Sequence, residues 1–375
     1  MPLPSAILSC WRAAGALVLA SMAWFGGGAS AADPLGRFPA DPGQVSVSGI
    51  SSGAFMASQL HVAHSAGIMG AGIIAGGPFG CAVDRVTGDG VAALVSLALG
   101  PCMSTPSLLK PVAFYAGLIA DLAARGWIDP PANLARSRIY LFTGKADKVV
   151  NSKVVETGAG LYRALGVPDS QIDFRDRGLP GAGAGHSWVT RNFGNACDAN
   201  ASPYINNCNY DQAGEMLQTL YGSLQPPAAA PDGRIVAFDQ AEFVARKAAR
   251  ANGLSDTGYL YVPKACDAGA AQPCRLHVVL HGCLQSAELL GVEFYTKIGV
   301  NEWAEANRII VVYPQAHATT VSELSLQNAQ SMLNTNPQGC WNWWGYANDT
   351  MFLTRQGVQI DAIWSMVRRV TGQGN

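Results

Sequence analysis

Short segments rich in Val, Ile and Tyr alternate with helical patterns along this chain, and no other feature constrains its fold more. The short segments are bounded by turn residues and predict buried strands at 45–50, 72–76, 138–144, 258–263, 276–282 and 308–314. Helical patterns cover 54–66, 107–125, 152–165, 210–222, 297–307 and 355–370. Strands that alternate with helices favour a mostly parallel sheet with helices on both faces. The sequence therefore predicts an α/β fold.

The N-terminal segment differs in composition from the rest of the chain. Arg12 precedes an apolar, alanine-rich run over 13–25, and small residues at 29–31 provide a cleavage site. This pattern predicts a secretory signal peptide over residues 1–31, with an apolar core too short to span a membrane; an uncleaved N-terminal anchor is the alternative. No later segment is apolar for long enough to cross a bilayer. We expect an exported protein, extracellular or periplasmic, without a membrane span.

Residues 32–375 are enough to bury one large core, and we expect a single catalytic domain there. The Pro- and Ala-rich stretch 225–234 could be a linker between two domains, but the catalytic residues predicted below favour a surface loop within one. A formal net charge of −1 and 14% charged residues leave no basic stripe, so we expect no nucleic-acid partner.

Cysteine usage fits export. Cys10 lies in the predicted signal peptide, and the other eight cysteines are an even number, which favours disulfides in an oxidising compartment. Pairing nearest in sequence suggests Cys81–Cys102, Cys197–Cys208, Cys266–Cys274 and Cys283–Cys340, although eight cysteines permit about 105 connectivities. A zinc site is the alternative, but no C-x-x-C motif occurs and the histidines do not cluster with the cysteines. We therefore expect no metal.

The stretch VSVSGISSGAFMASQL (45–60) carries a G-x-S-x-G box where a predicted strand meets a predicted helix. Such a turn exposes a serine hydroxyl and needs small neighbours, which Gly49 and Gly53 provide. Ser51 is the central residue of the box and is the predicted nucleophile. The backbone N–H of Ser52 is the predicted first donor of an oxyanion hole. A Gly/Ser turn without a special role is the alternative.

A serine nucleophile needs a base, and the base needs an orienting carboxylate. His186 is the predicted base because it lies in a glycine-rich loop after a strand-like segment, where a side chain is free to reach the serine. An ordinary loop histidine is the alternative. The predicted acid is Asp147, in the loop after the strand at 138–144, with Asp173 and Asp176 as rivals.

A second oxyanion donor is predicted where a buried strand runs into His-Gly-Cys, a variant of the HG-type oxyanion loop. Gly282 lets the backbone approach a substrate, and Cys283 would donate its N–H, with its thiol in a disulfide rather than acting as a nucleophile. His281 is expected to shape this loop. His61 and His64, on the helix after the serine box, are expected to cap or pack.

The segment CWNWWGY (340–346) holds four aromatic residues within six positions. Core packing is the usual fate of Trp, and an apolar wall for an ester substrate is the functional interpretation; both stay open. Trp341 is the leading candidate for substrate contact because it adjoins Cys340.

Four of these segments together resemble the catalytic domain of polyhydroxybutyrate depolymerases: GISSGAFMA, the HGCLQ loop, VVYPQA and CWNWW. The similarity covers most of the chain after the signal peptide, and the HGC loop combined with CWNWW is more specific than the serine box. The resemblance implies an α/β-hydrolase fold and a serine esterase that hydrolyses polyhydroxyalkanoate polyesters or their oligomers without a cofactor. It also implies a triad of Ser51, Asp147 and His186, with Ser52 and Cys283 forming the oxyanion hole.

The order of the motifs differs from the commoner arrangement in this family. There the HGC loop precedes the serine box, whereas here it follows the box by about 230 residues. This order is similar to the circularly permuted subgroup of the family. The helix predicted near 357–372 looks like the one that normally leads into the elbow strand, and permutation is tolerated where chain ends lie close together.

Many secreted members carry a linker and a separate polymer-binding domain after the catalytic domain, and we expect neither here. The predicted function is a secreted serine esterase for poly(3-hydroxybutyrate) or its oligomers. The nearest alternative is a carboxylesterase for other bulky or aromatic, feruloyl-type esters. A non-catalytic polymer-surface binder that keeps a hydrolase fold is a third interpretation.

Overall fold

The strands alternate their side chains between two apolar cores. In β3 (Arg138–Phe142), Ile139 and Leu141 enter one core cluster, while Tyr140 and Phe142 enter the other. Neighbouring strands of the sheet divide their side chains in the same way. A strand that is apolar on both faces belongs to a sheet covered by helices on both sides.

The computed structural model describes residues 32–373 apart from 85–90, 177–182, 246–248, 268–271, 320–334 and 348. The signal peptide predicted over 1–31 lies outside the described residues. Residues Ala32–Asn375 form one compact unit.

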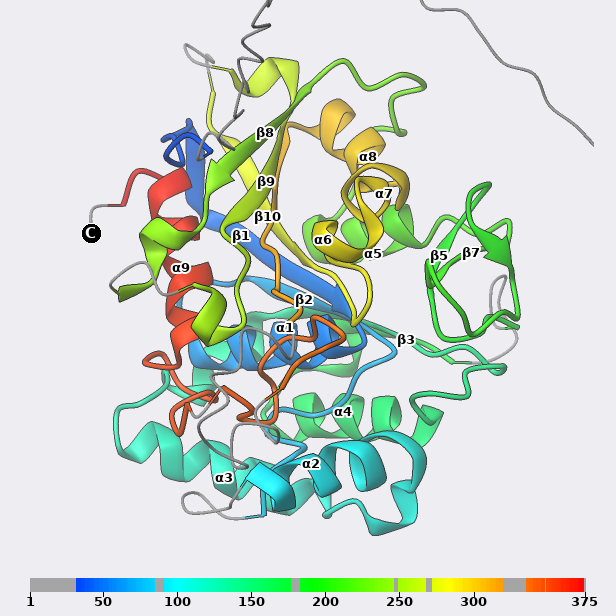
Figure 1. Cartoon of the computed structure of the whole chain (residues 1–375), viewed down its shortest axis with the longest axis vertical. Helices are drawn as coiled ribbons and strands as arrows, with labels where there is room; N and C mark the ends of the chain where they lie inside the picture. The colour runs from blue at the N-terminus through cyan, green and yellow to red at the C-terminus, as the bar shows by residue number, and fades with distance from the viewer. Residues whose placement is uncertain are drawn as a thin grey trace, which may run out of the picture. The chain divides into compact units, whose positions relative to one another are not determined.

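Eight strands form the large sheet (Figure 1). They are β1 (Ala40–Ile50), β2 (Gly70–Ile74), β3, β4 (Ile172–Arg175), β8 (Arg234–Asp239), β9 (Thr257–Val262), β10 (Cys274–Leu280) and β11 (Ile309–Tyr313). Their order is β4-β3-β2-β1-β10-β11-β9-β8. The β11–β9 and β9–β8 pairs are antiparallel, and the other neighbours are parallel. The central strand β1 thus lies between β2, which follows it closely, and β10, from much later in the chain.

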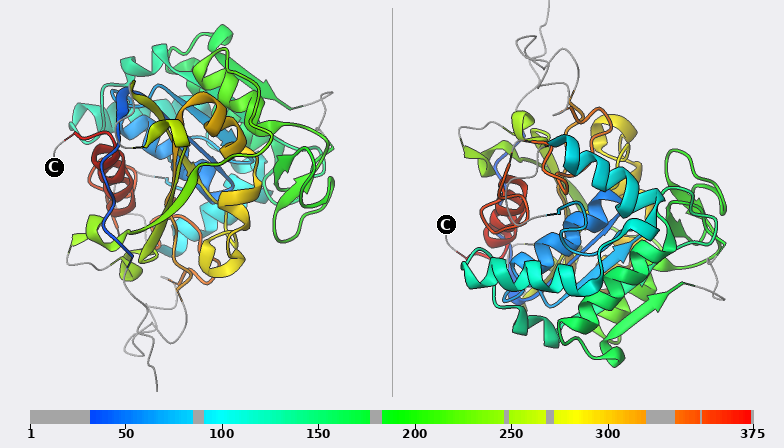
Figure 2. Two further views of the ribbon diagram at one scale, coloured as in Figure 1. Left: turned by 90° about the horizontal axis from the view of Figure 1, so that it is seen from above. Right: turned by 90° about the horizontal axis from the view of Figure 1, so that it is seen from below.

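Helices cover both faces of this sheet. They are α1 (Ser52–Ala63), α2 (Val91–Leu99), α3 (Val112–Ala124), α4 (Ser152–Ala164), α5 (Gln212–Tyr221), α6 (Ala287–Leu290), α7 (Glu293–Lys297), α8 (Val300–Asn307) and α9 (Val358–Val370). Buried residues of α1, α3, α4 and α9 join one core cluster, and those of α5, α7 and α8 join the other. Figure 2 shows the two groups on opposite sides of the sheet. The predicted α/β fold class is confirmed.

A second, small sheet follows the loop that holds His186. It contains β5 (Trp188–Thr190), β6 (Asn195–Ala196) and β7 (Ile205–Asn207), in the order β5-β7-β6. Four disulfides join the predicted pairs, Cys81–Cys102, Cys197–Cys208, Cys266–Cys274 and Cys283–Cys340. One of them closes the loop between β6 and β7.

Three features differ from the sequence-based expectation. The helix expected from residue 107 begins only at Val112, because Pro111 takes the N-cap position and Pro106 starts a separate 3₁₀ turn. The edge strand β8 is absent from the prediction, although four of its six residues (RIVAFD) are apolar; only Phe238 among them is buried. The helix α2 is apolar at nearly every position, so it shows no helical period.

Candidate active site

The serine box forms a sharp turn between β1 and α1. Ser51 has φ 56° and ψ −124°, a conformation that residues with side chains rarely adopt. Small neighbours allow it: a Cβ on Gly49 would clash with the carbonyl of Gly53, and a Cβ on Gly53 would clash with the carbonyl of Leu280. The N–H of Ser51 donates to the Ile74 carbonyl at 2.9 Å. The turn therefore holds the serine at the carboxyl end of the central strand.

His186 and Asp147 meet across two loops. Nδ1 of His186 lies 2.9 Å from Oδ2 of Asp147, and the two side chains are only 4% and 1% exposed. Because a carboxylate only accepts hydrogen bonds, Nδ1 carries the hydrogen and Nε2 remains to accept a proton. The N–H groups of Val149 and Val150 donate to Oδ1 of Asp147 at 2.8 and 2.9 Å. The carboxylate is thereby fixed in one orientation toward the imidazole.

The register of the sheet brings the HGC loop next to the elbow. Gly49 of β1 pairs with Leu280 of β10, which ends directly before this loop. A Cβ on Gly282 would lie 3.3 Å from the Cβ of Ser51, so the close approach favours glycine. Ser52 is the first residue of α1, where a backbone N–H has no partner within the helix.

Hydrogen bonds fix the loop on both sides of Cys283. The N–H of Gly282 donates to Oε1 of Gln285 at 2.7 Å, and the N–H of Leu284 donates to the carbonyl of Gln338 at 2.7 Å. Among the hydrogen bonds between described residues, none uses the N–H of Cys283. This amide is therefore held in place while its donor stays available.

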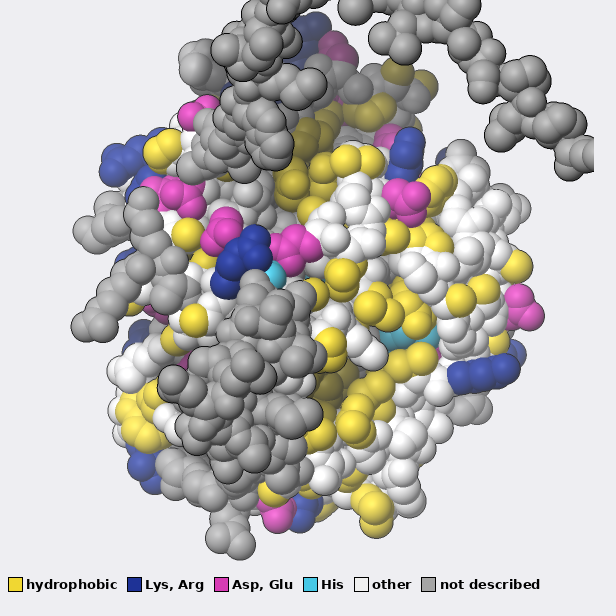
Figure 3. Space-filling view, in the orientation of Figure 1, with side chains coloured by type: hydrophobic (Ala, Val, Ile, Leu, Met, Phe, Trp, Pro, Cys, Tyr) yellow, Lys and Arg dark blue, Asp and Glu magenta, His cyan; other side chains and the backbone are white. Residues whose placement is uncertain are grey.

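Two cavities meet at Ser51. The smaller, of about 110 Å³, is lined by Ser51, His186, Gly282, Cys283 and Tyr204 among others, so the predicted nucleophile, base and oxyanion loop face one space. The larger, of about 300 Å³, is bounded by both predicted oxyanion residues and by a mainly apolar wall. That wall comprises Phe55, Val95, Ala98, Leu99, Met103, Val150, Trp343 and Trp344. Figure 3 shows hydrophobic side chains gathered on this face, between the positions of α2 and α6 in Figure 1.

Comparisons with known proteins identify the family. No family model matches the chain. A polyhydroxybutyrate depolymerase of Talaromyces funiculosus is 36% identical over 347 residues, which cover 91% of this chain and 93% of that protein. The chain belongs to the polyhydroxybutyrate depolymerase family. A poly(3-hydroxybutyrate) depolymerase of Delftia acidovorans is 38% identical over 356 residues and 94% of this chain, but the match spans only 65% of the Delftia protein.

Solved depolymerase structures share the fold. The crystal structure of the enzyme from Penicillium funiculosum matches with a TM-score of 0.77 and 32% identity, over 91% of this chain and all of that chain. A serine-to-alanine variant of a depolymerase, complexed with an R3HB trimer, matches with the same values. The fold of the present chain is therefore the fold of solved members of its family.

The structure does not support the predicted substrate contact of Trp341. Its side chain is fully buried and lines neither cavity beside Ser51. Its Nε1 instead donates to the carbonyl of His281 at 2.9 Å, which ties it to the oxyanion loop. Trp343 and Trp344 line the larger cavity in its place. The aromatic segment thus packs in the core at Trp341 and lines a cavity at Trp343 and Trp344.

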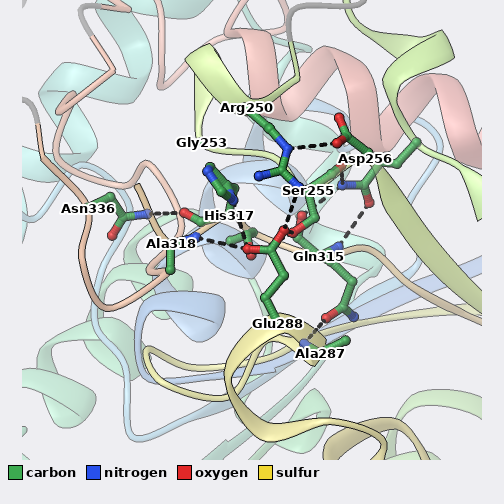
Figure 4. Close-up of polar contacts among 12 residues, drawn as sticks. Arg250, Gly253, Ser255, Asp256, Ala287, Glu288, Gln315, His317, Ala318 and Asn336 are labelled. Carbon is green, nitrogen blue, oxygen red and sulfur yellow. Dashed lines mark hydrogen bonds and ion pairs between the residues drawn. The ribbon is translucent and has the colours of Figure 1, made fainter. Parts of the chain in front are cut away.

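A polar cluster braces the far end of the oxyanion loop (Figure 4). The carboxylate of Glu288 accepts from Oγ of Ser255 at 2.8 Å and lies 2.7 Å from Nδ1 of His317 and 3.7 Å from Arg250. Burial raises the pKa of Glu288, but the hydrogen bonds from His317 and Ser255 outweigh it and lower the pKa overall. The carbonyl of His317 accepts from Nδ2 of Asn336, which lines the larger cavity. The cluster therefore links α6 to the cavity wall.

Four other histidines line neither cavity beside Ser51. His61, His64 and His277 are buried, and burial lowers the pKa of each to about 3. His64 is the C-cap residue of α1, as its position predicts. Burial also lowers the pKa of His281 to about 4, and its Nε2 accepts from the N–H of Ala316 at 3.0 Å. These side chains pack and shape loops, as the sequence predicts for all but His277.

The rival carboxylate Asp173 binds Arg175, with Nε–Oδ1 and Nη2–Oδ2 distances of 2.6 and 2.8 Å. The carboxylate found at His186 is that of Asp147. Among the described residues, no group of His, Cys, Asp or Glu could hold a metal ion. No helix in the described part of the chain is both long and apolar enough to span a membrane.

Proposed function

We propose that this member of the depolymerase family is a serine esterase that hydrolyses poly(3-hydroxybutyrate) or its oligomers. The observation that carries the proposal is the shared cavity of Ser51, His186 and Cys283, with Asp147 bound to the histidine. The names of the two relatives and the R3HB trimer bound by a structural neighbour support a polyester substrate.

In the proposed reaction, Oγ of Ser51 attacks the ester carbonyl carbon while Nε2 of His186 accepts the hydroxyl proton. Asp147 holds the imidazole in the required tautomer and stabilises its protonated form. The proton then passes to the leaving alcohol, which leaves an acyl-serine. Water attacks this ester and gives a proton to Nε2 of His186, which passes it to Oγ of Ser51 as the acyl bond breaks; the products are a 3-hydroxyacid and free Ser51.

The negative charge formed at the carbonyl oxygen needs donors that are in place beforehand. The amides of Ser52 and Cys283 fit this role, since one begins α1 and the other lies in a loop held on both sides. The mainly apolar wall of the larger cavity suits the methyl-bearing backbone of a 3-hydroxybutyrate chain.

Product analysis tests the proposal. Purified protein without residues 1–31 is incubated with amorphous polyhydroxybutyrate, 3-hydroxybutyrate oligomers and aryl esters, side by side with Ser51→Ala. We expect the wild type to release 3-hydroxybutyrate and short oligomers, and Ser51→Ala to release neither. Hydrolysis of aryl esters alone would instead support the carboxylesterase alternative, and undiminished activity of Ser51→Ala would contradict the mechanism.

We also infer that the chain is a circularly permuted α/β-hydrolase. The oxyanion strand β10 pairs with the elbow strand β1, although it follows β1 in sequence. The end of α9 adjoins the segment that enters β1, where the N–H of Phe38 donates to the carbonyl of Val370 at 3.0 Å. A direct connection there would put the oxyanion strand before the elbow.

We further infer export from the cell. Four disulfides close loops in the described part of the chain, and disulfides persist in oxidising compartments. Sequencing of the N-terminus of the protein recovered from culture medium and periplasm tests this inference. Recovery of the protein only from the cytoplasm, still beginning at residue 1, would contradict the inference.

A further inference from the structure

We propose that Asn200 is a positioning residue that holds the acid and the base in register for catalysis. This inference rests on the proposed esterase function. No motif or spacing in the sequence points to Asn200, and Asn200 lines neither cavity beside Ser51. It therefore acts through Asp147 and His186 rather than on the substrate.

The side-chain amide of Asn200 uses its whole hydrogen-bonding capacity. Its Oδ1 accepts from the N–H groups of Lys148 and His186, each at 2.9 Å. Its Nδ2 donates to the carbonyls of Ala146 at 2.9 Å and Asp198 at 3.1 Å. An asparagine amide offers two acceptor and two donor positions, and all four are filled.

Three of these four contacts go to the backbone of the catalytic loops. Ala146 and Lys148 are the residues on either side of Asp147, so the amide holds a peptide group on each side of the acid. The contact with the N–H of His186 anchors the base to the same side chain. The acid and base are 39 positions apart in sequence, so their 2.9 Å contact depends on such bridges.

The loop that carries Asn200 is itself fixed. The Cys197–Cys208 disulfide closes it, and the carbonyl of Cys197 accepts from the N–H of Gly185, next to His186. Nδ2 of Asn206 donates to the carbonyls of Cys197 and Ala199 at 2.9 and 2.8 Å. A restrained loop is a rigid support from which one amide can set the position of two other loops.

The expected effect of removing the amide is on rate rather than on binding. A misplacement of about 1 Å in a catalytic group costs on the order of 10²-fold in rate. Asn200→Ala should therefore lower kcat for p-nitrophenyl butyrate by about 10- to 100-fold, with KM within about threefold of the wild type.

A matched control, Asn195, lies in β6, directly before this loop. Nδ2 of Asn195 donates to the carbonyls of Ala201 and Ser202 at 3.0 and 3.2 Å, but its side chain contacts neither Asp147 nor His186 in any described hydrogen bond. Asn195→Ala removes the same amide and two loop hydrogen bonds. Its kcat should stay within about threefold of the wild type, because the catalytic groups keep their positions.

A double-mutant cycle separates positioning from general destabilisation. In an Asp147→Ala background, Asn200→Ala should lower single-turnover hydrolysis by less than about threefold, because residues that act as a unit are strongly non-additive. An equal loss in both backgrounds, or an equal kcat loss in Asn195→Ala, would overturn the proposal. So would full kcat in Asn200→Ala. Failure of the wild type to hydrolyse any ester would instead refute the proposed esterase function.

Discussion

Gln285 links the oxyanion loop to the loop that borders His186. Its Oε1 accepts from the N–H of Gly282 at 2.7 Å, and its Nε2 donates to the carbonyls of Pro203 and Tyr204 at 2.9 and 3.0 Å. The peptide between His281 and Gly282, one before the peptide that carries the Cys283 N–H, is therefore oriented by one buried side chain. The HGCLQ motif includes this glutamine, but the sequence alone does not show what its amide contacts.

Replacement of Gln285 by alanine should lower kcat without preventing folding. The Gly282 N–H would lose its hydrogen-bond acceptor, and the neighbouring Cys283 amide would no longer be held in its orientation. Loss of one oxyanion donor lowers the rate by about 10²–10³-fold. We expect a kcat loss of up to about 10²-fold with a similar KM, measured on p-nitrophenyl butyrate. A kcat equal to that of the wild type would show that the loop orients itself without this side chain.

At the scale of elements, the oxyanion loop and the aromatic segment are joined by the Cys283–Cys340 disulfide. The carbonyl of Cys340 accepts from Nδ2 of Asn336 at 2.8 Å, so the bridge continues into the wall of the larger cavity. The bridge therefore stabilises the fold and restrains the amide that is proposed to bind the oxyanion.

Replacement of both cysteines of this bridge by serine should reduce stability and kcat together. The stability loss should be on the order of 2–4 kcal/mol, which urea unfolding measures. The control is the corresponding double replacement at Cys266 and Cys274, a bridge at the start of β10, away from the cavities. That control should lower stability but keep kcat. Equal kcat losses in both variants would contradict a specific role of the Cys283–Cys340 bridge.

The sequence predicts the elements that carry the site better than the contacts between them. The sequence predicts Ser51 and Cys283 because a turn and a strand end leave local signals. Trp341 and Trp343 have identical side chains two positions apart, and only the path of an irregular loop decides which one faces the cavity. Asn200 could not be found, since its contacts join loops that are distant in sequence and leave no pattern.

At the scale of the whole molecule, buried neutral histidines make stability depend on pH. Burial lowers the folded-state pKa of His61, His64 and His277 from 6.5 to about 3, and that of His281 to about 4. Below about pH 6.5 the unfolded chain binds protons at these groups while the folded chain does not. The stability is therefore complete above pH 6.5 and is lost as the pH falls toward 4.

This linkage predicts that the free energy of unfolding decreases between pH 6.5 and 4 by up to about 1.4 kcal/mol per pH unit for each such histidine. His277→Gln should make that decrease shallower, although its loss of contacts lowers stability at every pH. Urea unfolding at pH 7, 6 and 5 measures the free energy of unfolding of the wild type and of His277→Gln. An unchanged slope in His277→Gln would mean that the folded protein protonates this side chain.

The proposed permutation predicts that the chain tolerates a different opening. A gene that joins residue 372 to residue 38 through a short linker, and opens the chain within the surface stretch 225–234, keeps every strand and helix intact. We expect a folded protein with ester hydrolysis within about tenfold of the wild type, since permutation succeeds where ends adjoin and the new break is exposed. An insoluble or inactive product would contradict the proposed join.

The proposed catalysis depends most on an acyl intermediate that Ser51 forms with the help of Asp147 and His186. Peptide mapping by mass spectrometry, after the protein reacts with an organophosphonate ester, tests it most directly. We expect a single covalent adduct on Ser51 in the wild type, and slow or no labelling in His186→Ala. An adduct on another residue, or labelling of His186→Ala at the wild-type rate, would contradict it.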